Sequence, residues 1–228
     1  MKLKIKWDNF IRILNIRVIN SQNYINRLTV PALVALAVLV IDQWSKIWVK
    51  TNMYLGQEFR VADWFIIHFT ENPGMAFGME LGGDYGKIIL SVFRIVAVIG
   101  IAWYILKLSK EGAHKGFLVS MGLILAGAVG NILDSVFYGQ IFTESSAHIA
   151  QNVAFGQGYA PMLYGRVVDM LYFPLFDGFF PDWVPIWGSE HFMFFRPVFN
   201  IADSAITVGV ALIIIFQKSY FAEENESK

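Results

Sequence analysis

Residues Leu28 to Val49 read LTVPALVALAVLVIDQWSKIWV, an apolar stretch that carries charge only at Asp42 and Lys46. About 20 predominantly apolar residues are enough to cross a bilayer as a helix. Three further stretches have a similar length and character: Ile88 to Leu106, Phe117 to Val136, and Phe199 to Phe216. The sequence therefore predicts an all-α membrane protein built as a four-helix transmembrane bundle.

The composition agrees with this class. The 228 residues are 56% hydrophobic and 16% charged, whereas soluble domains carry about a quarter charged residues. The net charge is zero, and no basic stripe suggests a nucleic-acid partner. The chain has no cysteine, which excludes disulfides and thiolate zinc ligands, and its four histidines are scattered. We expect no metal and no cofactor.

Basic residues are distributed unevenly among the connections. Residues 1–27 hold six Lys and Arg against one acid, and the short connection after the second span holds Lys107, Lys110 and Lys115. Because cytoplasmic loops are enriched in Lys and Arg, both termini are predicted in the cytoplasm and the two long connections outside.

Four regions flank or interrupt the spans. Residues 1–27 are either a flexible basic tail or an interfacial amphipathic helix, with a slight preference for the helix. Residues 28–217 form the membrane domain, and 218–228 read as an acidic cytoplasmic tail. The stretch Phe59 to Phe69 predicts a small extracytoplasmic β element. The aromatic, proline-rich stretch Phe173 to Phe195 is predicted to lie at the headgroup level.

Polar residues from different spans reach one depth. At the helical rise of about 1.5 Å per residue, Asp42, Asn131, Asp134 and Asp203 lie roughly 20 to 26 Å from the inner ends of their helices. Asp169 follows the third span on the outer side and reaches the same level. An ionisable residue at a membrane span is by default a candidate functional residue.

Plainer explanations apply to several of these residues. Asp42 and Lys46 are i,i+4 neighbours, and a locally paired, snorkelling lysine is as good an explanation as a chemical role. Asn131 and Asp134 suit interhelical hydrogen bonds better than catalysis. Asn200 is placed to cap the last span or to orient the aspartate three residues later.

The stretch Glu71 to Gly78 is a turn by composition. It is either a plain connection or a loop that binds a peptide through its backbone and through Asn72.

Five short motifs together resemble the bacterial lipoprotein signal peptidases, the type II signal peptidases. They are Asp42-Gln43-Trp44-Ser45-Lys46, Asn72-Pro73-Gly74-Met75-Ala76-Phe77, Gly130-Asn131-Ile132-Leu133-Asp134, Gly165-Arg166-Val167-Val168-Asp169, and Phe199-Asn200-Ile201-Ala202-Asp203-Ser204. Each motif is weak alone, but the five occur in the right order relative to the four spans. The resemblance covers roughly Leu28 to Phe216.

The resemblance implies an intramembrane aspartyl endopeptidase of the bacterial inner membrane. Its substrates would be prolipoproteins, cut just before the diacylglyceryl-modified cysteine, and its partners those substrates and membrane lipid, with the enzyme a monomer. The catalytic residues would be Asp169 and Asp203. The supporting residues would be Asp42, Lys46, Asn72, Gly74, Asn131, Asp134 and Asn200. Two close carboxylates share one proton, which suits them to activate water.

The chain departs from the family pattern in places. Ser135 stands where the family has an arginine, so Arg166 or Arg196 would be the candidate partner of Asp134. The segments 138–164 and 172–198 are longer than usual.

Two other classes of protein remain: an ion-coupled transporter using intramembrane acids, and a structural membrane protein whose acids only pair helices. Neither would cleave a lipidated peptide.

Overall fold

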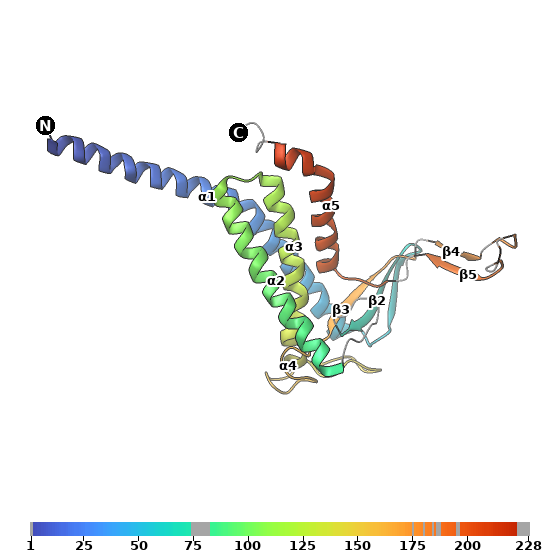
Figure 1. Ribbon diagram of the computed structural model, residues 1–228. Coiled ribbons are helices and arrows are strands. Elements are labelled where there is room, and N and C mark those ends of the chain that lie inside the picture. Colours follow the sequence, from blue (N-terminus) through green and yellow to red (C-terminus); the bar gives the residue numbers. More distant parts are fainter. Residues whose placement is uncertain are drawn as a thin grey trace.

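The computed structural model describes residues 2–73, 83–174, 176–179, 181–183, 185, 188–194 and 197–222. Four helices in it are long and apolar enough to cross a bilayer (Figure 1), which confirms the predicted spans. They are α1 (Lys2–Asn52), α2 (Gly83–Glu111), α3 (Lys115–Leu133) and α5 (Ile201–Phe221). Helix α1 is continuous from Lys2. Whether residues 1–27 are a mobile tail or lie at the interface stays a prediction.

Helix α3 is the centre of the bundle and packs on α1, α2 and α5. Small residues allow the close approach, as is typical of helix packing in membranes. A Cβ atom added at Gly127 would lie 2.2 Å from the carbonyl oxygen of Ala202 in α5, and one at Gly122 would lie 3.1 Å from that of Pro31 in α1. Helix α5 can therefore begin directly against α3, where the polar residues gather.

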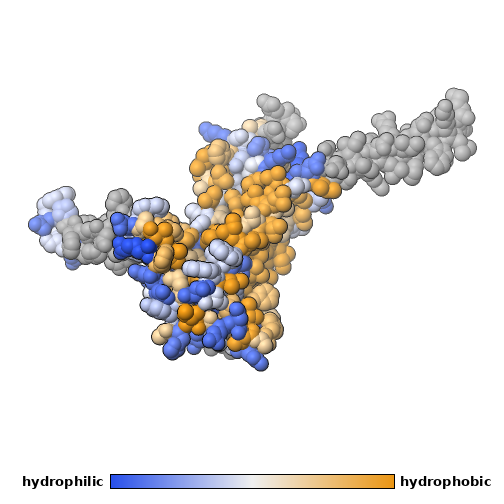
Figure 2. Space-filling view, turned by 180° about the vertical axis from the view of Figure 1, so that it is seen from behind, coloured by the Kyte–Doolittle hydropathy of each residue, from blue (hydrophilic) through white to orange (hydrophobic). Residues whose placement is uncertain are grey.

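The outer surface of the bundle is apolar. Leu33, Ile99 and Ile215 on three different helices are each at least 60% exposed, and the hydrophobic colour covers the helices in Figure 2. Such a surface is stable only in contact with lipid, where the helices satisfy their own backbone hydrogen bonds.

A small sheet covers one end of the bundle (Figure 1). The strands β1 (Glu58–Ala62), β2 (Phe65–Asn72) and β3 (Val167–Tyr172) are antiparallel in the order β1-β2-β3. The predicted β element is therefore present, and β3 extends it. The predicted turn from Glu71 is wrong at its start, because Glu71 and Asn72 still pair with β3.

The aromatic stretch between the sheet and α5 contains a separate hairpin, β4 (Phe176–Phe179) and β5 (His191–Phe194), which extends away from the bundle in Figure 1. Trp183, in its connection, is 81% exposed. An exposed aromatic side chain is compatible with the predicted place at the headgroup level, which stays a prediction.

Two short helical turns follow α3: a π-helical turn, η2 (Asp134–Tyr138), and α4 (Gly139–Ile141). Such π-bulges shift the backbone register and are frequent at functional sites. Gly165 packs against the widened turn: its N–H donates to the carbonyl of Ser135 at 2.9 Å, and an added Cβ would lie 2.2 Å from the carbonyl of Asp134. The glycine thus lets the strand that carries Asp169 approach the end of α3.

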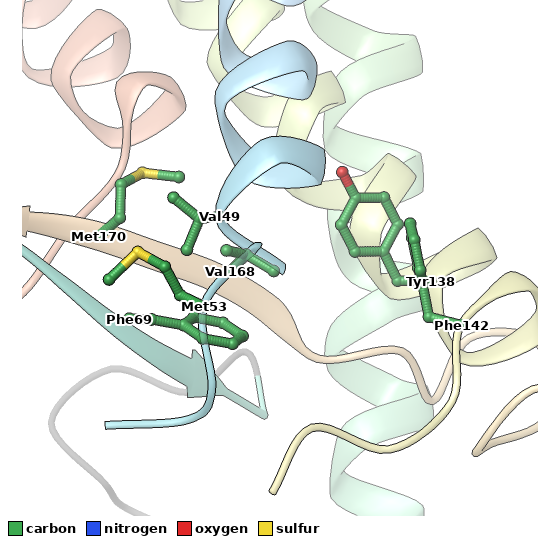
Figure 3. Close-up of a cluster of buried hydrophobic side chains, with 7 residues drawn as sticks. All are labelled: Val49, Met53, Phe69, Tyr138, Phe142, Val168 and Met170. Atoms are coloured by element: carbon green, nitrogen blue, oxygen red, sulfur yellow. The ribbon is translucent and has the colours of Figure 1, made fainter. Parts of the chain in front are cut away.

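A hydrophobic cluster joins the sheet to the bundle (Figure 3). Its side chains come from the end of α1, from β2 and β3, and from η2 and the residues after it. They are Val49, Met53, Phe69, Tyr138, Phe142, Val168 and Met170. The cluster fixes β3 relative to the helices and so fixes the height of Asp169.

Candidate active site

Lys46 is fully buried and makes three polar contacts with its Nζ atom. It lies 2.9 Å from Asp42 Oδ2 and 2.9 Å from Asp134 Oδ2, and it donates to Asn131 Oδ1 at 2.9 Å. An ammonium group has three N–H donors, so its donors are all used. The predicted i,i+4 pair of Asp42 and Lys46 is confirmed, and its charge is shared with α3.

The expectation that Arg166 or Arg196 pairs with Asp134 is wrong for Arg166, while Arg196 lies outside the described residues. Asp134 pairs with Lys46 instead. Its Oδ1 atom also accepts a hydrogen bond from the side chain of Gln43 at 2.9 Å. Arg166 pairs with other acids. With Lys46 as cation, Asp134 needs no arginine at position 135, and Ser135 donates to the carbonyl of Asn131.

Asn200 links the two aspartates that the sequence singles out. Its Nδ2 donates to Asp169 Oδ1 at 2.7 Å, and its Oδ1 accepts from the backbone N–H of Asp203 at 2.9 Å. Asn131 completes the connection, because its Nδ2 donates to Asp203 Oδ1 at 2.8 Å and its Oδ1 accepts from Asn200. The predicted residues of α3, β3 and α5 therefore form one hydrogen-bonded network.

Local helix chemistry places Asp203. Asn200 is the N-cap of α5, and the cap is reciprocal, because Asp203 Oδ2 accepts from the backbone N–H of Asn200 at 3.3 Å. Asp42 adds a second acceptor at this helix start through the N–H of Ala202, at 2.9 Å. Carboxylates are stabilised at a helix N-terminus by its unpaired N–H groups and its dipole. The predicted capping role of Asn200 is confirmed.

Asp169 lies on β3 and is only 5% exposed. Burial, followed by the nearby charge of Asp203, raises the pKa of Asp169 to about 7. Asn200 opposes part of this rise by donating to the carboxylate. The site thus contains one carboxyl group that keeps a proton near neutral pH and a second carboxylate that accepts two N–H donors. Such a pair can act as general acid and general base.

The remaining predicted residues are less central. Asn72 is the last residue of β2 and pairs with Val167, two residues before Asp169. Gly74 lies outside the described residues. Gln43 was missed as a site residue although it follows Asp42 directly; its amide also contacts Asp42 at 3.1 Å and the carbonyl of Gly130 at 3.1 Å.

Within the described part of the chain, no three His, Cys, Asp or Glu side chains gather as metal ligands would. A cavity of about 410 Å³ lies at the far end of the bundle, beside the turn between α2 and α3, and includes none of the network residues. The network itself consists of carboxylates, side-chain amides and one lysine.

The sequence and the fold are similar to those of known proteins. The family described as signal peptidase (SPase) II matches residues 34–218. A lipoprotein signal peptidase of Porphyromonas gingivalis is 55% identical over 188 residues, which are 82% of this chain and 81% of the relative. One from Amoebophilus asiaticus is 45% identical, with 82% and 76% covered. A solved structure of a bacterial membrane enzyme, obtained by the in meso method at 1.9 Å resolution, is similar with a TM-score of 0.52 at 27% identity, covering 82% of this chain and 90% of the other.

Proposed function

Because the chain belongs to the signal peptidase II family, we propose that it is an aspartic endopeptidase that removes the signal peptide from prolipoproteins. Family membership makes it a multi-pass bacterial membrane protease. The cut falls immediately before the diacylglyceryl-modified cysteine, with Asp169 and Asp203 as the catalytic pair. The observation that carries the proposal is the contact of Asn200 with both aspartates.

In the proposed reaction the pair binds a water molecule and shares one proton. The ionised carboxylate takes a proton from the water while the water oxygen attacks the scissile carbonyl carbon. The protonated carboxyl donates its proton to the carbonyl oxygen. When the tetrahedral intermediate collapses, a proton goes to the leaving amide nitrogen. The products are the carboxylate of the signal peptide and the free amine of the modified cysteine. The roles belong to the pair rather than to either residue.

The remaining network residues hold this pair in place. Asn131 and Asn200 hold the carboxylates, and Lys46 pairs with two buried acids, Asp42 and Asp134. Asn72 and the backbone of the following loop, including Gly74, bind the substrate peptide. No metal takes part, and the enzyme acts as a monomer.

The site faces the outer leaflet, and both termini are cytoplasmic. Support comes from the end of the bundle that faces away from the sheet. There Arg27 donates to the carbonyls of Gly112 and Ala113 in the basic α2–α3 connection, and Tyr220, near the end of α5, stacks on His114. The basic residues of the N-terminal segment and of this connection therefore share one end, as cytoplasmic residues do.

A cleavage assay with purified protein tests the proposal. A peptide with a diacylglyceryl-modified cysteine is incubated with wild-type protein, Asp169→Asn or Asp203→Asn in lipid micelles, and the products are identified by mass spectrometry. We expect cleavage before the modified cysteine by the wild type alone, and none of the same peptide with an unmodified cysteine. Turnover by either folded variant would refute the pair, and a cut at another bond would refute the cleavage site.

A further inference from the structure

A second charge cluster, built on the buried ion pair of Lys50 with Glu71, lies beside the proposed site. We call it the Lys50 cluster; it consists of Lys50, Glu71, Glu144, Ser145 and Arg166. Lys50 is fully buried in the last turn of α1, and the side chain of Glu71, on β2, is 2% exposed. The Lys50 Nζ atom contacts Glu71 Oε1 and donates to Ser145 Oγ at 2.8 Å.

The charges of the cluster are balanced within it. The second oxygen of Glu71 lies 3.4 Å from Arg166 Nη1, and Arg166 Nη2 reaches Glu144 at 3.2 Å. Ser145 also donates to Glu71 Oε1 at 2.7 Å. Two cations meet two carboxylates, so the cluster holds chain segments together rather than awaiting a charged ligand. Buried charges are tolerated when they are paired in this way.

Side chains of the long segment after α3, residues 138–164, surround much of Lys50. Lys50 Nζ lies 5.4 Å from the ring centre of Phe142 and 5.0 Å from that of Tyr159, and the guanidinium of Arg166 lies 5.4 Å from the latter. The backbone N–H of Arg166 donates to the Tyr159 hydroxyl at 2.6 Å. The segment 138–164 thus completes the enclosure of Lys50.

The strand register shows what the cluster holds. Glu71 pairs with Val168 and Thr70 with Asp169, and successive side chains of a strand point to opposite faces. Glu71 therefore shares the face of Val168, which packs on the end of α1 in the hydrophobic cluster of Figure 3. Asp169 and Asn72 belong to the opposite face. The Lys50 cluster therefore contacts the face of the sheet opposite Asp169. The contact is made at Glu71, which directly precedes Asn72.

Strand β3 has further anchors of its own. The N–H of Val168 donates to Asp134 Oδ2 at 3.2 Å, its carbonyl accepts from Asn200 at 3.3 Å, and Leu171 exchanges backbone hydrogen bonds with Phe199. Loss of the Lys50–Glu71 contact would leave these in place, so Asp169 would keep its position. The end of β2 would instead lose its ion pair with α1 and would be held there only by its pairing with β3 and by the packing of Phe69.

We propose that Lys50 and Glu71 are positioning residues, which hold the end of β2 so that Asn72 meets the substrate peptide. The inference rests on the proposed function, in which this edge binds substrate. It predicts an effect on KM with little effect on kcat, because the aspartate pair is held separately. Loss of a substrate contact that is equally strong in the ground state and the transition state raises KM alone, and one weakened hydrogen bond is expected to raise it about tenfold.

The test uses a neutral double variant. Either single change leaves an unpaired buried charge and can prevent folding, whereas removal of both partners is often tolerated. Lys50→Met with Glu71→Gln leaves Arg166 and Glu144 as a balanced pair. The control is Lys107→Met with Glu111→Gln, which removes an exposed i,i+4 pair at the other end of the bundle. Ser145→Ala is a second control that keeps the ion pair.

Four quantities are compared with those of the wild type: kcat and KM for the lipidated peptide, the thermal midpoint, and amide hydrogen exchange of residues 66–72. The double variant should fold, raise KM about tenfold with kcat within about twofold, and exchange faster in β2, because the strand has lost a tertiary anchor. The control at Lys107 and Glu111 should match the wild type in every quantity. Ser145→Ala should match it in kcat and KM, although its thermal midpoint falls because two buried hydrogen bonds are lost.

An unchanged KM in the folded double variant would overturn the inference, as would losses of rate that only follow the loss of folded protein. Failure of the proposed function is distinguishable, because the wild type would then not cleave the peptide at all. The hydrogen-exchange comparison would still report whether the cluster holds β2.

Discussion

Replacement of Asp169 by asparagine should abolish cleavage and, above neutral pH, make the folded protein more stable. The carboxyl of Asp169 is buried beside Asp203, and its pKa is raised from 3.8 to about 7. Asparagine has nearly the same shape, and its side-chain oxygen can still accept the hydrogen bond from Asn200 at 2.7 Å. It cannot ionise or exchange the shared proton.

The sign follows from proton linkage. Between about pH 4 and pH 7 the folded protein keeps a proton on Asp169 that the unfolded chain has released, so the free energy of unfolding of the wild type falls as the pH rises. Above about pH 7 the full cost of a buried, ionised carboxylate is present. At about 1.4 kcal/mol per pKa unit, a rise from 3.8 to about 7 corresponds to about 4 kcal/mol. The asparagine variant avoids this loss.

Thermal unfolding in detergent at several pH values measures the effect. The Asp169→Asn midpoint should match that of the wild type near pH 4 and exceed it near pH 8 by roughly 10 °C, since 1 kcal/mol shifts the midpoint of a chain of this size by about 2–4 °C. Asp203→Asn serves as comparison, because loss of the neighbouring charge lowers the pKa of Asp169 and weakens the pH dependence. A variant that is destabilised near pH 8, or that keeps the wild-type pH dependence, would refute this reasoning.

Three further outcomes are expected. Lys46→Met leaves two buried carboxylates without their cation and should lower the free energy of unfolding by about 3–5 kcal/mol; a thermal midpoint equal to that of the wild type would contradict the buried triad. Gly127→Ala places a Cβ atom 2.2 Å from the carbonyl oxygen of Ala202 and should cost about 1–3 kcal/mol by forcing α5 away from α3, whereas Gly100→Ala, with no atom within 4 Å, should be neutral in the same melting experiment. Activity should survive a metal chelator, and loss of activity that zinc restores would show that a metal is required.

The parts of the site that sequence predicted well depend on local geometry. The four spans follow from apolar length, the contact of Asp42 with Lys46 follows from i,i+4 spacing, and the cap at Asn200 follows from its place before an apolar run. In each case the partners lie within one turn of helix, so their spacing along the chain determines their distance in space.

The errors and omissions involve contacts between distant segments. Asp134 takes its cation from Lys46, 88 residues earlier in the chain, rather than from Arg166. Lys50 follows Lys46 by four residues, so the two lysines lie on the same face of α1. The partner of Lys50 is Glu71 on β2, however, and that contact depends on how the sheet packs against the helix. Local spacing cannot specify which segments meet across the bundle.

Asn200 makes the assembly of the proposed site depend on both α5 and the sheet. The same side chain begins α5 and holds Asp169 from the sheet, so the proposed dyad cannot exist before the last helix has inserted and β3 has docked beside it. A half-assembled bundle in the membrane would carry both acids and still be catalytically silent. A nascent chain would therefore be unable to cut nearby peptides before its fold is complete.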